Sequence, residues 1–450
     1  MMKVVVVGGV AGGATAASQL RRLEPDCDIT IFEKDRDISF ANCGLPYFIG
    51  GEVAERNQLI AATPETFGKK DVQVHTHHEV IGVNTGENHL TVKNLKTGEV
   101  FEESYDRLIL SPGGRPRIIP SLADVPSMHV LHTLEDMDRI MKFIDDEDIK
   151  EAVVVGSGFI GMEVTENLRM RDIDVTLVHR NEDLYGHIEA EMVAPLLQEL
   201  EDRGVNLKLN AEISRVEGGC AHLTNNEKIP APMIIQGIGL TPNTEFLRDS
   251  GVDVTDRGLI PVNDYGQTNV ENVYALGDVM ETKYLHVPEV AANIKLAWPA
   301  HRMAYTIANH IHGKYDIKFE GLLGTNIMRF FDYEIGAIGL EQKDVRGIDH
   351  FVIDHQQNFK AGYMEGASKI RIKMYVGHDG TILRAALISK SGVDKRLDTL
   401  ATHIRSGGKA QDLINIEVAY SPPFSSPKSF LNMVGYKAIE EMKKRGLYLT

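Results

Sequence analysis

The sequence has little cysteine, one tryptophan and no excess of basic residues. Its three cysteines, Cys27, Cys43 and Cys220, are too few and too scattered for a disulfide framework or a zinc site, which favours a reducing compartment. A formal net charge of -16 argues against nucleic acid as the main partner, because phosphate neutralisation needs a basic face. No run approaches the roughly 20 apolar residues that span a bilayer, so no membrane partner is expected. We therefore expect a cytoplasmic protein, large enough at 450 residues for about three domains.

Two segments repeat one order of features: a β-branched apolar run, a glycine turn, a helical pattern and a second apolar run. The first is "KVVVVGGVAGGATAASQLRRL" with "DITIFEK", and the second is "EAVVVGSGFIGMEVTENLRMRDIDVTLVHR". The glycines of the first segment fall where a strand turns into a helix, which argues against a signal sequence. Such segments predict βαβ units, and hence an α/β fold with two Rossmann-like units on parallel sheets.

The second glycine motif, "GSGFIG", is complete and directly follows a strand. Its glycines allow a tight turn and close approach of the backbone to a pyrophosphate. The next strand ends in His179 and Arg180, where an NAD site usually presents an acid, and cations suit a 2′-phosphate. NADPH is therefore the preferred nucleotide, although Arg180 is also explained as a surface charge. The predicted contacts are Gly156, Gly158, Phe159, Ile160, Gly161, His179 and Arg180.

The first motif, "GGVAGG", departs from the pattern because Val10 occupies the middle glycine position. Glu33 supports it, since this acid ends the next strand where it can bond ribose hydroxyls. One site suited to ribose hydroxyls and one suited to a 2′-phosphate suggest bound FAD with NADPH as reductant. Asp278 in "ALGD" is expected to bond the ribityl and pyrophosphate part of FAD. The predicted FAD contacts are Gly8, Val10, Ala11, Gly12, Gly13, Glu33, Lys34, Gly277 and Asp278.

In this order, the two glycine motifs, "LILSPG" and "VYALGD" resemble the two-dinucleotide-binding flavoprotein disulfide reductases, over essentially the whole chain. The segments "SFANCGLPY" and "EVAYSPPFSSPK" are more narrowly similar to the coenzyme A-disulfide reductases. The glycine motifs are common to the superfamily, so the cysteine segment and the tail support the narrower resemblance.

The resemblance implies a homodimer of three-domain chains. We expect a discontinuous FAD-binding domain of residues 1–115 and 248–318, an NADPH-binding domain of residues 116–247, and a C-terminal α+β dimerisation domain of residues 319–450. In the last domain, alternating residues on both sides of "GHDG" predict a hairpin, and "AIEEMKKRG" predicts a helix near the C-terminus.

Cys43 is the expected redox centre. Glutathione reductases pair two cysteines five residues apart, whereas here Phe48 occupies the second position. A lone cysteine beside a flavin leaves three options: a mixed disulfide with a small thiol, a sulfenic acid that handles peroxide, or one that completes oxygen reduction. Peroxidase and oxidase relatives have a histidine in the first glycine loop, where this chain has Ala11, which weighs against peroxide chemistry. Cys27 and Cys220 are expected to be bystanders.

The helix after the first glycine turn has a polar stripe, formed by Thr15, Gln19 and Arg22 at positions i, i+4 and i+7. By itself the stripe is equally a solvated helix surface. The resemblance assigns it to coenzyme A, together with residues near the cysteine, in the middle and in the tail of the chain. This substrate-binding set is Thr15, Gln19, Arg22, Ser39, Asn42, Lys70 (or Lys69), His301 and Lys428.

Two tyrosines complete the expected catalytic group. Tyr363 in "KAGYMEG" and Tyr420 in "EVAYSPP" match positions that the family supplies from the partner subunit, close to the disulfide and, for Tyr420, to the flavin. A phenol there can donate a proton to the departing coenzyme A thiolate. Each tyrosine alone is also explained as a core aromatic.

We therefore expect NADPH-dependent reduction of coenzyme A disulfide to two thiols through a Cys43 mixed disulfide with coenzyme A. One alternative is an NAD(P)H oxidase or peroxidase with a Cys43 sulfenic acid. A second is a coenzyme A-dependent persulfide or polysulfide reductase. A third is a redox-sensing flavoprotein in which Cys43 is only structural.

Overall fold

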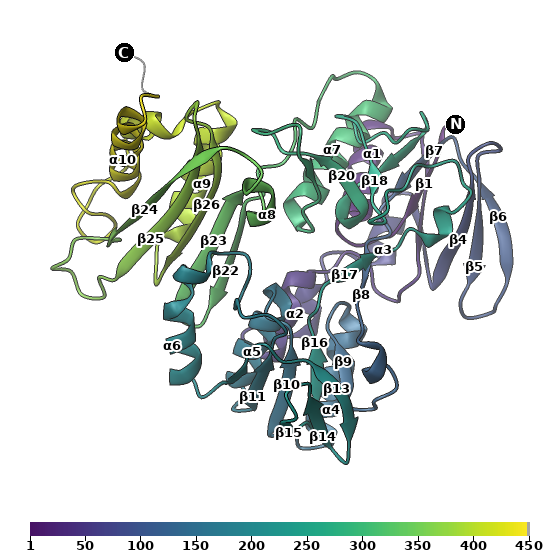
Figure 1. Cartoon of the computed structure of the whole chain (residues 1–450). Coiled ribbons are helices and arrows are strands. Elements are labelled where there is room, and N and C mark those ends of the chain that lie inside the picture. Colours follow the sequence, from purple (N-terminus) through teal and green to yellow (C-terminus); the bar gives the residue numbers. More distant parts are fainter. Residues whose placement is uncertain (448–450) are drawn as a thin grey trace.

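A computed structural model describes residues 1–447 (Figure 1). Its first sheet is parallel throughout, in the order β19-β7-β1-β2-β3. Residues Val4, Val5 and Val6 of the central strand have no exposed surface, as expected for a parallel sheet that is covered on both faces. β19 joins this sheet although it follows β7 by more than 160 residues. The strands are β1 (Lys3–Val7), β2 (Asp28–Glu33), β3 (Val72–Thr76), β7 (Arg107–Leu110) and β19 (Val273–Ala275).

Two long helices cover this first sheet. α1 (Ala11–Leu23) connects β1 to β2 and packs against α7 (Ala297–His312). The contact is built from small side chains, because Ala14, Ala16 and Ala17 of α1 are buried next to Ala304 and Ala308 of α7 in one apolar cluster. Small side chains let the two helices approach closely, and this close packing fixes the position of the start of α1 relative to the sheet.

A second parallel sheet has the order β12-β11-β10-β16-β9. Three helices pack on it: α4 (Leu134–Asp146), α5 (Phe159–Arg169) and α6 (Ala194–Asp202). An antiparallel ribbon of β8 (Gly114–Pro116) and β17 (Leu240–Pro242) marks where the chain enters and leaves this part of the molecule. The strands are β9 (Met128–Val130), β10 (Glu151–Val155), β11 (Asp174–Val178), β12 (Asn206–Lys208) and β16 (Ile234–Gln236).

The C-terminal part is an antiparallel sheet in the order β22-β23-β26-β25-β24, with α9 (Val393–Arg405) and α10 (Phe430–Lys444) packed on it. The predicted hairpin around "GHDG" is confirmed by the pairing of β25 with β26, and the predicted helix near the C-terminus is α10. The strands are β22 (Asn326–Phe330), β23 (Tyr333–Gly339), β24 (His350–Asn358), β25 (Lys369–Gly377) and β26 (Ile382–Ser389).

Smaller elements complete the chain. Short helical turns are η1 (Asn42–Gly44), α2 (Leu45–Ile49), η2 (Arg56–Leu59), α3 (Pro64–Gly68), η3 (Pro120–Leu122), η4 (Ala190–Met192), η5 (Glu245–Leu247), η6 (Gly277–Val279), α8 (Gln342–Val345) and η7 (Ala410–Asn415). Small sheets are formed by β4 (His78–Asn84), β5 (His89–Asn94) and β6 (Val100–Ser104), by β13 (Ile213–Glu217), β14 (Cys220–Leu223) and β15 (Lys228–Pro230), and by β18 (Ile260–Pro261), β20 (Met280–Lys283) and β21 (Ala291–Ala292).

The predicted α/β class with two parallel-sheet units is confirmed. Within residues 1–447, no helix is long and apolar enough to cross a bilayer.

Candidate active site

The two glycine motifs place a helix N-terminus at the end of a parallel strand, in each of the two sheets. A Cβ atom on Gly13 would lie 1.9 Å from the carbonyl oxygen of Gly8, and one on Gly161 would lie 1.8 Å from that of Gly156. Only glycine permits this close packing of the helix on its turn. Neither α1 nor α5 has an acidic residue in its first turn or a side-chain cap. The first N–H groups of both helices are therefore available to a phosphate.

Glu33, which is buried, and Asp278, which is partly buried, flank the first glycine turn. The carboxylate of Glu33 accepts hydrogen bonds from the backbone N–H of Gly9 at 2.7 Å and of Asp35 at 2.9 Å, so the glycine turn and the end of β2 are fixed together. Asp278 lies on η6, directly after Gly277, and its carboxylate makes no hydrogen bond within the described part of the chain. Burial raises the pKa of both groups. A partly buried carboxylate without a donor, such as that of Asp278, is suited to a ligand hydroxyl, and this geometry fits a dinucleotide such as FAD.

His179 and Arg180 follow β11 beside the second glycine turn. The backbone N–H of Ser157 donates to Nδ1 of His179 at 3.3 Å, so this ring nitrogen has no proton. Burial and the neighbouring Arg180 lower the pKa of His179. Arg180 is exposed. The positive charge predicted at the end of this strand therefore resides on Arg180, and a neutral His179 has its Nε2–H left to donate.

Cys43 lies on η1, immediately before α2, and is exposed. The protein around the thiol still removes it partly from water, and this desolvation raises the pKa of Cys43, with further contributions from the carboxylates of Glu163 and Asp278. No lysine or arginine of the described chain counteracts them. The segment before Cys43 contains Ser39 in the left-handed backbone region, with φ of 47°. Strain of this kind in a non-glycine residue is typical of functional segments.

The other two cysteines lie outside this setting. Cys27 is buried, its thiol contacts the carbonyl oxygen of Met2 at 3.1 Å, and burial raises its pKa to about 11. Cys220 begins β14, the central strand of the antiparallel sheet β13-β14-β15. Of the three cysteines, Cys43 is the one whose residue is exposed to solvent and open to a ligand.

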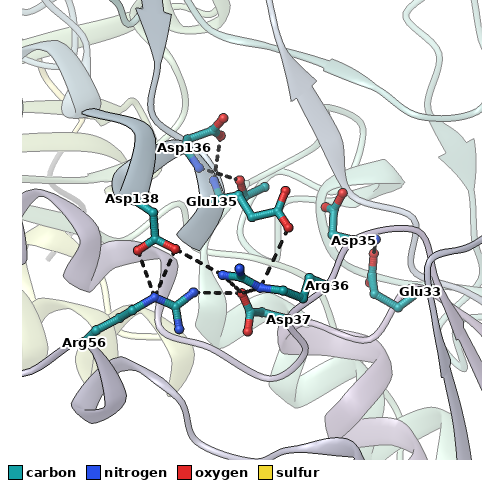
Figure 2. A network of polar contacts seen from close by, with 9 residues as sticks. Glu33, Asp35, Arg36, Asp37, Arg56, Glu135, Asp136 and Asp138 are labelled. Carbon is teal, nitrogen blue, oxygen red and sulfur yellow. Dashed lines mark hydrogen bonds and ion pairs between the residues drawn. The ribbon is translucent and has the colours of Figure 1, made fainter. Parts of the chain in front are cut away.

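An ion network holds the segment that leads from Glu33 to Cys43 against the second unit (Figure 2). Arg56 contacts Asp138 of α4 at 2.8 Å and Asp37 at 2.9 Å. Arg36 contacts the same two carboxylates, each at 3.0 Å, and Glu135 at 3.8 Å. The network joins residues on both sides of Cys43 to the first turns of α4.

Four of the predicted coenzyme A residues line one hollow of about 200 Å³ beside α1. Thr15 and Arg22 come from α1, Ser39 from the strained segment and Lys70 from the end of the α3 region; Lys69 does not line it. Among residues 1–447, no carboxylate lines this hollow. The hollow thus combines two cations with hydroxyl groups in a chain of net charge -16.

The other predicted coenzyme A residues lie around this hollow or in the C-terminal part. His301 of α7 contacts the hydroxyl of Thr15 through Nδ1 at 2.7 Å. The side-chain oxygen of Gln19 accepts from Arg22 at 2.5 Å. Asn42, next to Cys43, donates to the carbonyl oxygen of His132 at 3.2 Å. Lys428 is far along the chain, exposed, and its backbone oxygen accepts from Gln357 at 3.1 Å.

Tyr363 and Tyr420 belong to the same end of the C-terminal part as Lys428. Their side chains are 77% and 51% exposed, so neither is a core aromatic. The N–H of Ala361 donates to the carbonyl oxygen of Pro422 at 3.2 Å, which joins the two tyrosine segments. Within the described chain, neither tyrosine makes a hydrogen bond or ring contact with the Cys43 segment. A single chain therefore divides the predicted site into two groups of residues.

The sequence interpretation missed a polar cluster around α2, formed by Tyr47, Glu52, Glu163, Glu166 and Arg329. Tyr47 donates to Glu163 at 3.5 Å, and Arg329 of β22 lies 3.4 Å from Glu166 and 5.1 Å from the centre of the Tyr47 ring. The sequence feature that could have revealed this cluster is the pair Glu163 and Glu166. These two acids lie three residues apart in a helix whose other residues are mostly buried. Among residues 1–447, no group of His, Cys, Asp or Glu could hold a metal ion.

Comparison with known proteins agrees with this geometry. The profile of the family described as pyridine nucleotide-disulphide oxidoreductase matches residues 2–304. The chain is 44% identical over 440 residues to a protein called coenzyme A disulfide reductase from Staphylococcus haemolyticus, covering 97% of this chain and 99% of that protein. The crystal structure of reduced Bacillus anthracis CoADR-RHD has a TM-score of 0.94 and 38% identity, over 98% of this chain and 81% of that one. A structure described as an NAD-dependent persulfide reductase from A. fulgidus has a TM-score of 0.93 and 28% identity, over 99% and 84% of the two chains. The predicted resemblance is thereby confirmed, and the chain belongs to the pyridine nucleotide-disulphide oxidoreductase family, where it groups with proteins called coenzyme A disulfide reductases.

Proposed function

We propose that this protein reduces coenzyme A disulfide to two coenzyme A thiols, with NADPH as the electron donor. The observation that favours this substrate most is the hollow beside α1, which Arg22 and Lys70 make positive and no carboxylate lines. Coenzyme A contains phosphate groups, which such a pair of cations binds through charge-assisted hydrogen bonds. Ser39 lines the hollow and belongs to the Cys43 segment. One continuous surface can therefore bind both the nucleotide end and the sulfur end of coenzyme A. The name of the Staphylococcus haemolyticus relative supports the same substrate.

FAD is the cofactor that the family implies for the first glycine turn, where it would supply two-electron transfer between the nicotinamide and sulfur. Gly8, Gly12, Gly13 and the free N–H groups of α1 would bind its pyrophosphate, and Asp278 would bind a hydroxyl of its ribityl part. Glu33 already accepts from the backbone N–H of Gly9 in the glycine turn and from that of Asp35 after β2, so it holds the turn in shape and would accept further bonds through its remaining lone pairs.

Arg180 is the residue that favours NADPH over NADH in this proposal. Its guanidinium is exposed at the end of β11, where a 2′-phosphate is bound in dinucleotide sites of this type. His179 adds a neutral Nε2–H donor. The A. fulgidus protein is described as NAD-dependent, so the preference depends on these particular side chains and is not a property of the fold.

The sulfur chemistry proceeds in two balanced steps at Cys43. In the first, two electrons break the S–S bond between Cys43 and a bound coenzyme A, which yields the Cys43 thiolate and a coenzyme A thiolate that takes up a proton. In the second, the Cys43 thiolate attacks coenzyme A disulfide, which restores the mixed disulfide and releases the second coenzyme A. Phe48 stands where related reductases place a second cysteine, so the mixed disulfide takes the role of their internal disulfide.

The proton donors in this proposal come from the partner chain of a homodimer. Tyr363 and Tyr420 are exposed and joined through neighbouring backbone, so both are available to a second chain. A partner that places them at Cys43 would supply a phenol O–H to the departing thiolate.

The test is anaerobic oxidation of NADPH in the presence of coenzyme A disulfide. We expect two thiols for each NADPH oxidised, and we expect Cys43→Ser to lose this turnover while it retains FAD. Cys27→Ser and Cys220→Ser are matched controls that should retain it. NADPH oxidation that requires oxygen or peroxide, or that proceeds only with a polysulfide, would contradict the assignment of the disulfide as substrate.

A further inference from the structure

The loop after β11 returns to the second glycine turn. Residues 179–189, here named the β11 loop, connect β11 to η4 without a helix or strand, so their position depends on contacts with other parts of the chain. The backbone N–H of Tyr185 donates to the hydroxyl oxygen of Ser157, inside the glycine motif, at 3.1 Å. The ring centre of Phe159, the first residue of α5, lies 5.6 Å from that of Tyr185 and 4.5 Å from that of His187. The loop therefore lies against the turn where the predicted nucleotide binds.

Arg384 of β26 holds the far end of the β11 loop. Its guanidinium donates to the carbonyl oxygen of His187 at 2.7 Å and to that of Leu340 at 2.8 Å. A third N–H group donates to the carboxylate of Glu189 at 2.8 Å. Arg384 and Glu189 are only 5% and 3% exposed. One buried side chain thus joins both the backbone and a carboxylate of the loop to the C-terminal sheet.

Three more side chains of the C-terminal part contact the end of the β11 loop and the turn that follows it. Gln342 of α8 donates to the carbonyl oxygen of Ile188 at 2.8 Å. Arg371 of β25 donates to the carbonyl oxygen of Glu191 at 2.7 Å, and Lys373 of the same strand forms an ion pair with the Glu191 carboxylate. Carbonyl groups outside helices and strands need donors from elsewhere, and here a different part of the fold supplies them.

The contact of Arg384 with the loop is suited to fixing a position more than to adding stability. Removing an ion pair from water costs much of what its attraction returns, and apolar side chains of similar size would stabilise such a contact as well or better. Arginine differs from them in presenting a rigid planar fork of donors, which fixes the direction of each hydrogen bond. The β11 loop therefore has one defined position between the C-terminal sheet and the second glycine turn.

We propose that Arg384 is a positioning residue for the nicotinamide nucleotide: it holds the β11 loop against the second glycine turn, so that Arg180 and the N-terminus of α5 bind one nucleotide together. The C-terminal part thereby takes part in nucleotide binding, although it contributes none of the predicted NADPH contacts. Without Arg384, the nucleotide itself must order the loop, and its affinity falls with the fraction of molecules in which the loop is in place. The inference rests on the proposed use of NADPH at this turn.

The test is the Kd of NADP+ for the oxidised, FAD-containing protein, measured by titration calorimetry without turnover. Arg384→Met combined with Glu189→Leu removes the ion pair and leaves no buried charge unpaired, so the variant should fold, which its FAD content and unfolding midpoint verify. We expect the Kd to rise roughly five- to tenfold, the effect of losing the hydrogen bonds of one charged side chain. Gln342→Ala, which removes one bond at a half-buried residue, should act in the same direction with a smaller effect.

Two further readouts distinguish positioning from a general loss of structure. Without nucleotide, amide hydrogen exchange in residues 181–191 should be several-fold faster in the double variant than in the parent. In turnover, the KM for NADPH should rise while kcat and the KM for coenzyme A disulfide stay close to those of the parent. A fall in kcat with an unchanged KM for NADPH would overturn the proposal.

Arg396→Met is the matched control. Arg396 of α9 is also a buried arginine of the C-terminal part, and it donates to the carbonyl oxygens of Gly392 at 2.7 Å and Phe359 at 2.8 Å, both outside the β11 loop. This variant should bind NADP+ as the parent does and leave exchange in the loop unchanged. Equal weakening by Arg396→Met and by the double variant would overturn the proposal, as would a double variant with the Kd of the parent.

Failure of the proposed function would be seen separately. A parent protein that binds NAD+ and not NADP+ would contradict the proposed choice of nucleotide, and the ratio of the Kd values of variant and parent for NAD+ would then decide the role of Arg384. A protein that does not reduce coenzyme A disulfide would contradict the proposed substrate and leave both titrations and the exchange measurement unaffected.

Discussion

At the scale of the residue, Cys43 has unusual surroundings for a reactive cysteine. Reactive thiols commonly lie beside lysine, arginine or a protonated histidine, which lower their pKa. Here the charged groups of the chain that act on the thiol are the carboxylates of Glu163 and Asp278, and both raise the pKa of Cys43. The protein alone therefore does not stabilise the thiolate, and in the proposed function this stabilisation depends on the bound cofactor.

Glu163→Gln should change how the stability of the protein depends on pH. The pKa of Glu163 is raised from 4.5 to about 7, so the folded state binds this proton more tightly, and ionisation of the group destabilises the fold as pH rises from 4.5 through 7. Glutamine removes that cost, and the variant should gain up to about 3 kcal/mol relative to the parent between pH 5 and pH 8. Thermal unfolding midpoints at the two pH values measure this gain. A difference between variant and parent that is the same at pH 5 and pH 8 would show that Glu163 ionises normally.

Arg180→Glu should weaken the use of NADPH relative to NADH. A charge-assisted bond to the 2′-phosphate is replaced by repulsion, so the ratio of kcat/KM values should fall roughly 10- to 100-fold. The control is Arg215→Glu, which makes the same change at another exposed arginine of the second unit. An unchanged ratio in Arg180→Glu would remove this residue as the source of the preference.

At the scale of the element, the network of Figure 2 fixes the segment that contains Cys43. This segment lies between β2 and α3, and its only regular structure is η1, α2 and η2, each of five residues or fewer. Such short turns have little stability of their own. The contacts of Arg36 and Arg56 with Asp37 and Asp138 therefore supply order that the local sequence does not.

Asp138→Asn should loosen this segment. The change removes one of the two carboxylates that both arginines share, at a cost of about 1 kcal/mol for a partly buried network. We expect amide exchange in residues 35–44 to become several-fold faster, which hydrogen-exchange mass spectrometry can measure. Asp146→Asn, which breaks an exposed pair with Lys142 on the same helix, should leave the segment unchanged. Equal effects of the two variants would mean that the network does not hold the segment.

The parts of the fold that follow from local sequence were predictable. The valine runs before each glycine motif predict buried parallel strands, and "GHDG" predicts a hairpin, because each pattern is completed within about ten residues. The contact of Arg56 with Asp138 spans 82 residues and that of Arg329 with Glu52 spans 277. No local pattern specifies such partners. The left-handed Ser39 was equally hidden, since serine has no preference for that conformation.

At the scale of the whole molecule, one chain holds the predicted site residues in two groups. The hollow with Arg22 and Lys70 is lined by Ser39 of the Cys43 segment, whereas Tyr363, Tyr420 and Lys428 lie on the C-terminal part. Sequence reasoning could name members of both groups through the resemblance. Their separation in space depends on how the C-terminal sheet is placed against the two parallel-sheet units, which motif order does not reveal.

Mixed dimers test whether the two groups come from different chains. One chain would contain Cys43→Ser and the other Tyr363→Phe with Tyr420→Phe, with different tags for purification. If the site is shared between chains, one of the two sites in the mixed dimer is intact, and about half of the parent activity should return. Neither variant alone should approach that level. A mixed dimer no more active than the tyrosine variant would place the whole site within one chain, and a monomeric protein would exclude a shared site.

The most direct test of the central claim, that Cys43 works through a mixed disulfide with coenzyme A, is the intact mass of the purified protein under conditions that remove FAD. The account predicts an adduct of coenzyme A mass that a reducing agent removes and that is absent from Cys43→Ser. An unmodified Cys43, or one that has gained a single oxygen atom, would contradict it and favour peroxide or oxygen chemistry at the same cysteine.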